Sequence, residues 1–284
     1  MSKVALVTDS TSYMPEELLK KYNISIAPQV LIWGDKTYND GVDIKPQEFF
    51  EKLKTAKVMP TTSQASPATI QPIFQGLVDQ GFEVIAIHVS SKLSGTVQSA
   101  TQAKEMMGKA GIKITVIDSL STSMAMSFQV LAVARALEAG ASLTDAIAIA
   151  EKARNHSGIC LVPETLEFLH RGGRIGGAQR FVGTLLNMKP VLELKDGRVE
   201  PVDRVRTKGK AHDRMIELVA ERVNGKPNIR VATLHANAAE DAKAVLAKAI
   251  QMFSPIENIF AEVSPTVGTH AGPGTVGLAF MTDL

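Results

Sequence analysis

EVIAIHVSSKLSGTVQSATQAKEMMGKAGIKITVID, residues 83–118, is the stretch that decides the fold. Its two ends, 83–89 and 113–118, are short apolar runs that predict two strands. The residues between them, 96–109, are typical of a helix. Two strands separated by a helix form a βαβ unit, in which the strands lie parallel in one sheet.

The same alternation continues on both sides of this unit. It predicts an N-terminal domain at residues 1–162 that is α/β and doubly wound, with a mostly parallel sheet. The further strands expected here are 3–8, 24–33 with an interruption at Pro28, and 158–162. One further helix is expected to begin at Pro15, and the others are expected at 46–55, 67–80, 123–139 and 142–156. In such sheets, ligands bind at the loops beyond the carboxyl ends of the strands.

The remainder of the chain, residues 163–284, predicts a second α/β domain with a mixed sheet. Asp196-Gly197 separates two strand-like runs within residues 190–206, which is a strong signal for an antiparallel hairpin. The other elements expected here are helices at 164–174, 208–223 and 238–252 and strands at 229–235, 258–263 and 276–281. A length of 284 residues is consistent with two domains.

Composition and charge argue against several classes of protein. Hydrophobic residues make up 45% of the chain and charged residues 21%, which argues against disorder. The net charge of +2 gives no support to nucleic-acid binding, which usually needs a strong basic excess. Cys160 is the single cysteine, so no disulfide or cysteine zinc site can form within the chain. Without a signal-peptide pattern or an apolar run of about 20 residues, we expect a cytoplasmic protein with no transmembrane segment.

The sequence carries none of the usual motifs of enzymes. Residues 272–277 read GPGTVG and match G-x-G-x-x-G formally, but a dinucleotide site needs a helix and an acidic residue about 20 positions further on, and only seven residues follow Gly277. Phosphate-loop, H-E-x-x-H and G-x-S-x-G motifs are absent, and the histidines lack metal-ligand spacing. We therefore expect no catalytic residue, no metal and no cofactor.

Three polar segments are interpreted as loops, at Thr61–Gln64, Ser90–Thr96 and Thr269–His270. Hydroxyl groups and the N–H groups at the start of a helix can together hold a carboxylate. Serine and threonine are also ordinary helix caps, and a histidine beside glycines can simply pack in its loop. The residues alone leave both interpretations open.

Five segments, in order along nearly the whole chain, resemble the DegV family. They are Thr8-Asp9-Ser10-Thr11, Thr62-Ser63-Gln64, Ser90-Ser91-x-x-Ser94-Gly95-Thr96, Leu169-His-Arg-Gly-Gly-Arg-Ile175 and His270-Ala-Gly-Pro-Gly-Thr275. The resemblance implies two α/β domains with a long-chain fatty acid, such as palmitate or oleate, buried between them. It also implies that Thr62 and Ser94 hold the carboxylate with His270 close by. The binding residues expected from these motifs are Thr62, Ser63, Ser94, Gly95, Thr96 and His270.

Some members of this family, the FakB proteins, present the fatty acid to an ATP-dependent fatty acid kinase, which makes an acyl phosphate for phospholipid synthesis. The resemblance therefore implies a non-catalytic carrier with a kinase partner. Arg171, Arg174 and Arg206 are candidates for docking that partner, and a solvated basic surface is the simpler interpretation of the same charges. Lys92 and Ala271 depart from the pattern of the family and leave the local loop shape open.

Two other functions remain open at this point. A hydrolase or acyltransferase would use Ser94 or Ser63 as its nucleophile, with His270 as the base if the fold brings them together. A lipid sensor would bind the same ligand but would regulate another protein.

Overall fold

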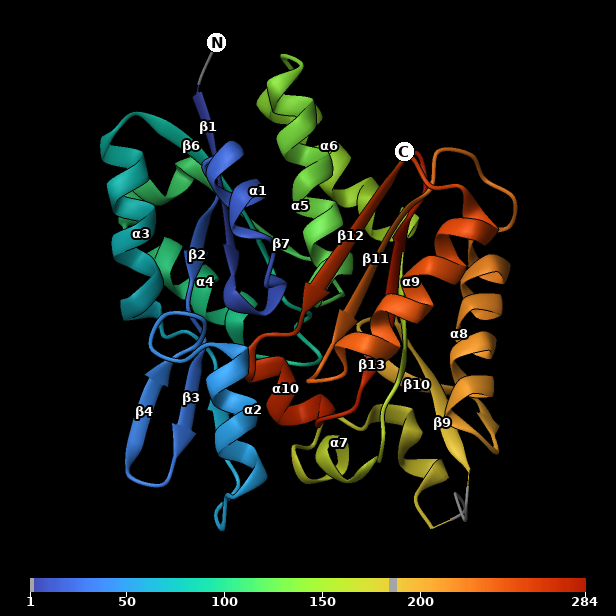
Figure 1. The fold of residues 1–284 in the computed structure, drawn as a ribbon. Coiled ribbons are helices and arrows are strands. Elements are labelled where there is room, and N and C mark those ends of the chain that lie inside the picture. The colour runs from blue at the N-terminus through green and yellow to red at the C-terminus, as the bar shows by residue number, and fades with distance from the viewer. Residues whose placement is uncertain (1–2, 184–187) are drawn as a thin grey trace.

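The computed structural model describes residues 3–183 and 188–284. These residues form a four-stranded sheet, a six-stranded sheet and a small three-stranded sheet (Figure 1). Helices lie against both larger sheets, which makes the protein α/β as the sequence predicts. No helix within the described ranges is long and apolar enough to cross a membrane.

The four-stranded sheet is parallel and doubly wound. Its strands are β1 (Lys3–Asp9), β2 (Ser25–Ala27), β6 (Phe82–His88) and β7 (Ile114–Asp118), in the order β2-β1-β6-β7. α3 (Pro67–Asp79) and α4 (Thr96–Met106) pack on one face, and α5 (Ser123–Glu138) and α6 (Leu143–Ala153) on the other. The strand order reverses direction between β1 and β6, which is the switch point where such sheets bind ligands.

The six-stranded sheet is mixed, as predicted. It contains β8 (Ser157–Val162), β9 (Lys189–Lys195), β10 (Arg198–Val205), β11 (Arg230–His235), β12 (Glu257–Glu262) and β13 (Val276–Met281), in the order β10-β9-β8-β13-β11-β12. β11 and β12 are parallel, and the other pairs are antiparallel. α8 (Lys208–Val223) and α9 (Ala239–Phe253) cover its outer face (Figure 1).

α5 lies between the two larger sheets and joins them into one core (Figure 1). Met124, Phe128 and Leu131 of this helix are fully buried, in one apolar cluster with residues of both sheets. A helix that is apolar on nearly all sides is typical of such a central position. Its N-terminus at Ser123 therefore lies in the interior, near the boundary between the sheets.

The small sheet corrects one prediction. Residues 24–33 were expected as one strand interrupted at Pro28. The interruption is present, but the two pieces belong to different sheets: β2 to the parallel sheet, and β3 (Val30–Trp33) to the small sheet, where it pairs with β4 (Lys36–Asn39) and β5 (Thr61–Ser63). The chain leaves the first sheet at Pro28, which has no N–H to continue a ladder. The polar segment at Thr61, expected as a loop, is therefore a short strand.

The strand pairing also bears on where the two halves of the chain divide. β8 was expected in the N-terminal domain, but it pairs with β13 and β9 in the six-stranded sheet. By sheet membership, Ser157–Val162 groups with the strands of the second half. The division into domains at 1–162 and 163–284 stays a prediction.

The remaining helices are short, apart from α2 beside the small sheet. They are α1 (Glu16–Lys21), α2 (Pro46–Lys54), α7 (Glu167–Arg171) and α10 (Pro265–Ala271), with 3-10 turns at Ser10–Ser12, Gly108–Lys113, Arg154–His156 and Gly176–Phe181. The segment Thr269–His270, expected as a loop, lies inside α10. Ser264 caps this helix by accepting a hydrogen bond from the N–H of Val267, and Pro265 occupies its first turn, where proline is favoured.

Candidate functional site

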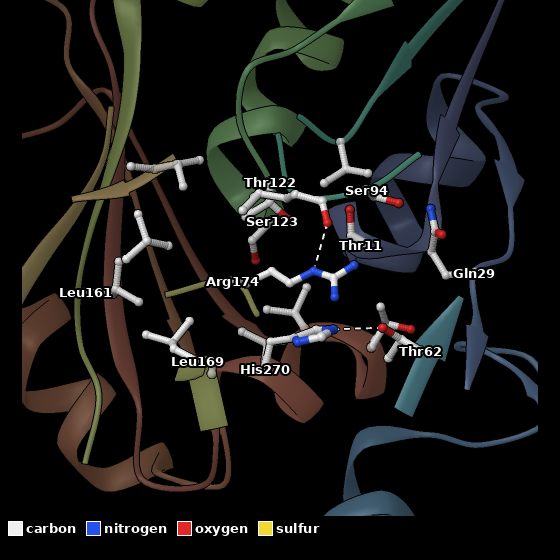
Figure 2. Close-up of a pocket in the computed structure, with 18 of the residues that line it drawn as sticks. Thr11, Gln29, Thr62, Ser94, Thr122, Ser123, Leu161, Leu169, Arg174 and His270 are labelled. Atoms are coloured by element: carbon white, nitrogen blue, oxygen red, sulfur yellow. Dashed lines mark hydrogen bonds between the residues drawn. The ribbon is translucent and has the colours of Figure 1, made fainter. Parts of the chain in front are cut away.

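A cavity lies between the carboxyl ends of the parallel sheet and the inner face of the six-stranded sheet (Figure 2). One part of its wall is polar and includes Thr11, Gln29, Thr62, Ser94, Arg174 and His270. The other part is apolar and includes Ile159, Leu161, Leu169, Leu194, Val199 and Leu234. Such a division suits an elongated ligand with one polar end.

Thr11 and Ser94 reach the cavity because β1 and β6 are neighbours. Thr11 follows β1 and Ser94 follows β6, so both lie at the switch point of the sheet. The buried carboxylate of Asp9 ties these ends together, since it accepts hydrogen bonds from the N–H and hydroxyl of Thr11 and from the N–H of Val89. Burial alone would raise the pKa of Asp9, but contact with His88 and these donors holds it below its ordinary value.

Thr62 and His270 meet at the polar end of the cavity. The distance from Thr62 Oγ1 to His270 Nε2 is 2.7 Å (Figure 2). Thr62 comes from β5 and His270 from α10, and Asp40 anchors that helix by accepting a hydrogen bond from the N–H of Thr266 at 3.1 Å. Gly172 leaves room for the imidazole, because a Cβ there would collide with Nδ1 of His270.

His270 is neutral at neutral pH. Burial and the positive charge of Arg174 lower the pKa of His270 to about 4. Its Nδ1 has no hydrogen-bond partner within the described residues. In the neutral tautomer with the proton on Nε2, the imidazole donates to Thr62 and leaves the hydroxyl of Thr62 free to donate, without adding a positive charge.

Arg174 lies at the cavity, although the sequence suggested a docking surface for it. Its Nε donates to the carbonyl of Leu93 at 3.0 Å, and its Nη1 donates to the carbonyl of Gly172 at 2.7 Å. Among the described residues, no Asp or Glu lines the cavity or forms an ion pair with Arg174. The guanidinium therefore offers positive charge to a ligand at this end.

The other expected binding residues lie in different positions. Ser63 lines the cavity beside Thr62. Thr96 is fully buried behind the wall and bonds to Ser94 and Gln29, while Gly95 packs against the side chain of Gln64. Gly95 and Thr96 therefore support the cavity wall without forming part of it.

Of the remaining candidates for partner docking, Arg171 and Arg206 are exposed. Arg171 pairs with Glu167 and borders a second, outer hollow, which shares Thr62, Arg174 and His270 with the main cavity. Arg206 borders neither hollow.

Sequence reasoning missed several lining residues. Gln29 stands in an apolar run and gave no signal, and Thr122 and Ser123 at the start of α5 resemble ordinary helix-start residues. Thr11 was within a quoted motif but was given no role. The apolar lining residues come from strands and helices whose apolar positions are also explained by core packing.

The fold and this cavity define an α/β protein with a ligand-binding cavity between its two larger sheets. Comparison with known sequences then gives the family: the profile described as "Uncharacterised protein, DegV family" matches residues 3–283. A DegV domain-containing protein of Halalkalibacterium halodurans is 34% identical over 284 residues, covering 100% of both chains. The chain belongs to the DegV family.

Several solved structures have the same fold. A DegV family protein from Thermus thermophilus, described as binding fatty acid, has a TM-score of 0.93 and 36% identity, with coverage of 99% of this chain and 100% of that one. DegV from Bacillus subtilis, described as a fatty acid binding protein, has a TM-score of 0.90 and 30% identity, with full coverage of both chains. A stearic acid-binding protein from Eubacterium ventriosum has a TM-score of 0.89 and 25% identity, covering 99% of this chain and 98% of that one.

Proposed function

We propose that this protein binds one long-chain fatty acid, such as palmitate or oleate, in the cavity. The carboxylate lies at the polar end, where Thr62 and Ser94 donate hydrogen bonds and Arg174 supplies positive charge. The acyl chain lies against the apolar wall formed by residues such as Leu161 and Leu194. The observation that carries the proposal is this combination of hydroxyl donors and an arginine with an apolar cavity.

The energetics suit tight binding without chemistry. Each buried methylene contributes roughly 0.8 kcal/mol, so about fifteen carbons contribute on the order of 12 kcal/mol before the costs of association. Burying a carboxylate is unfavourable unless it is hydrogen-bonded, which gives the polar end of the cavity its purpose. The solved relatives that are described as fatty-acid-binding support the same assignment.

Mass spectrometry tests the ligand directly. Native spectra of the purified protein should show a mass larger than the denatured chain by that of one fatty acid. Extraction should identify the acid and its chain length. A native mass equal to that of the bare chain, with no uptake of added palmitate or oleate, would contradict the proposal.

We further propose that the protein is a cytoplasmic carrier that presents the carboxylate to an ATP-dependent fatty acid kinase. The outer hollow supports this idea, because it borders the same Thr62, Arg174 and His270 that surround the polar end of the cavity. A partner pull-down separates this role from that of a lipid sensor: a carrier should recover a kinase and support acyl-phosphate formation, and a sensor should recover a regulated protein instead.

The carrier itself performs no catalysis in this proposal. His270 contacts Thr62 rather than Ser94 or Ser63, and no acidic side chain among the described residues orients its Nδ1. A serine hydrolase would need both contacts. The isolated protein should not hydrolyse p-nitrophenyl esters or ATP. Ester turnover that disappears in Ser94→Ala would establish the hydrolase alternative.

A further inference from the structure

Gln29 lies in the polar wall of the cavity and is almost completely buried. Its Oε1 is 3.1 Å from the N–H of Ala65, and its Nε2 is 2.8 Å from the hydroxyl oxygen of Thr96. A backbone N–H can only donate, so the oxygen of the amide must face Ala65. The NH₂ group of Gln29 must therefore face Thr96 and donate to it.

The hydroxyl of Thr96, which accepts from Gln29, also forms a hydrogen bond with the hydroxyl of Ser94. The two hydroxyl oxygens are 2.8 Å apart, and each hydroxyl has one proton to donate. The alternative acceptor for Thr96 is Oε1 of Gln29, which is more distant at 3.2 Å. When Thr96 donates to the nearer oxygen, that of Ser94, the proton of Ser94 is free to point into the cavity.

We propose that Gln29 is a positioning residue that makes Ser94 a hydrogen-bond donor toward the ligand. The relay runs from Gln29 through Thr96 to Ser94, and its direction favours a head group that only accepts hydrogen bonds, which is an ionised carboxylate. This inference rests on the proposed function and adds to it the residue that selects the charge state of the ligand.

The same glutamine also sets the spacing of the polar groups. Ala65 follows β5, which carries Thr62, and the backbone N–H of Gln29 donates to Ser10 at 3.0 Å, just before Thr11. Gln29 thus contacts the segments that carry Thr62, Ser94 and Thr11. Its side chain bonds to Ala65 and Thr96, which lie three residues beyond Thr62 and two residues beyond Ser94 in the chain.

Two substitutions of different charge test the relay. In Gln29→Glu, an ionised carboxylate accepts from Thr96, so Ser94 must donate to Thr96 and presents a lone pair to the ligand. In Thr96→Val, the relay is broken without any added charge. Isothermal titration should measure the affinities for palmitate and for hexadecanol, whose hydroxyl can both donate and accept.

The ratio of the two affinities is the decisive quantity. Palmitate should bind about tenfold or more weakly to Gln29→Glu and several-fold more weakly to Thr96→Val, whereas hexadecanol should change less than about threefold, since only the acid depends on a donor from Ser94. Thr96→Ser keeps the hydroxyl and should therefore show the wild-type ratio of palmitate affinity to hexadecanol affinity. If the ratio of palmitate affinity to hexadecanol affinity falls in Gln29→Glu but not in Thr96→Val, charge repulsion explains the result and the relay is overturned.

Gln129 provides a matched control. It is equally buried and bonds to Ser119 and Ser157, but it does not line the cavity. Gln129→Glu should therefore keep the wild-type ratio of palmitate affinity to hexadecanol affinity. A lower ratio in this variant would mean that any buried carboxylate disturbs the site. Failure of the wild-type protein to bind palmitate would contradict the proposed function, whereas normal binding with an unchanged ratio in all variants would contradict only the relay.

Discussion

Thr62 and His270 are 208 positions apart in the chain, yet Oγ1 of the first lies 2.7 Å from Nε2 of the second. The contact joins β5 of the small sheet to α10, which precedes the last strand of the six-stranded sheet. It therefore closes the polar end of the cavity from both halves of the chain. The imidazole is neutral, so it adds no positive charge beside Thr62. The hydroxyl of Thr62 is free to donate to a ligand when Nε2 of His270 carries the ring proton and donates to Oγ1.

Removal of the two hydroxyls should weaken the binding of acid more than that of alcohol. A hydrogen bond to a charged group contributes roughly 1.5–3 kcal/mol, so Thr62→Val and Ser94→Ala should each weaken palmitate binding about tenfold or more. The double variant should be weaker still, though not additive, because both hydroxyls act on one carboxylate. Calorimetric titration of palmitate and hexadecanol against all four proteins measures this. Equal palmitate affinity in the double variant and the wild type would place the carboxylate elsewhere.

Arg174 and Arg171 should have separate effects. Arg174→Met removes the positive charge at the cavity and should weaken palmitate binding by about tenfold. Arg171→Met changes an exposed side chain paired with Glu167 and should leave lipid affinity near that of the wild type. Charge reversal at Arg171 or Arg206 should instead slow coupling to a cognate kinase, most strongly at low salt. Normal kinase coupling in these variants at every salt concentration would remove both residues from the docking surface.

His270 should make the stability of the lipid-free protein depend on pH. Burial and Arg174 lower its pKa from 6.5 to about 4 in the folded state. Between these values the unfolded chain binds a proton that the folded chain does not, so the free energy of unfolding should fall as the pH is lowered from 6.5 to 4. Urea unfolding at several pH values should show a shallower fall in His270→Gln than in the wild type. Parallel curves for the two proteins would mean that His270 has an ordinary pKa.

The apolar wall should determine which chain lengths fit. Leu161 lines the cavity, and Leu161→Phe adds volume where the acyl chain is proposed to lie. The affinity for stearate should then fall more than the affinity for laurate, because the shorter chain can avoid the added ring. A defect in folding would lower both affinities together, so the ratio of the two is an internal control. An unchanged ratio would show that the chain follows another path.

Local sequence patterns determined most of the secondary structure. The strand at 276–281 has the predicted bounds, and Asp196-Gly197 forms the predicted hairpin turn with positive φ at both residues. The apolar pattern of residues 123–139 likewise matches α5 within one residue. The family motifs supplied Thr62, Ser63, Ser94 and His270, all of which line the cavity. These features depend on periodicity and short motifs, which a sequence contains directly.

Only the tertiary structure decided which strands pair and which side chains share the cavity. The chain crosses to a new sheet at Pro28, β8 joins the six-stranded sheet, and Arg174 bonds to Leu93, 81 positions away. Gln29 gave no signal in the sequence, because its partners Ala65 and Thr96 are 36 and 67 positions distant. Secondary structure follows from contacts between near neighbours, whereas strand order and the polarity of a buried site follow from contacts that form only when distant segments pack together.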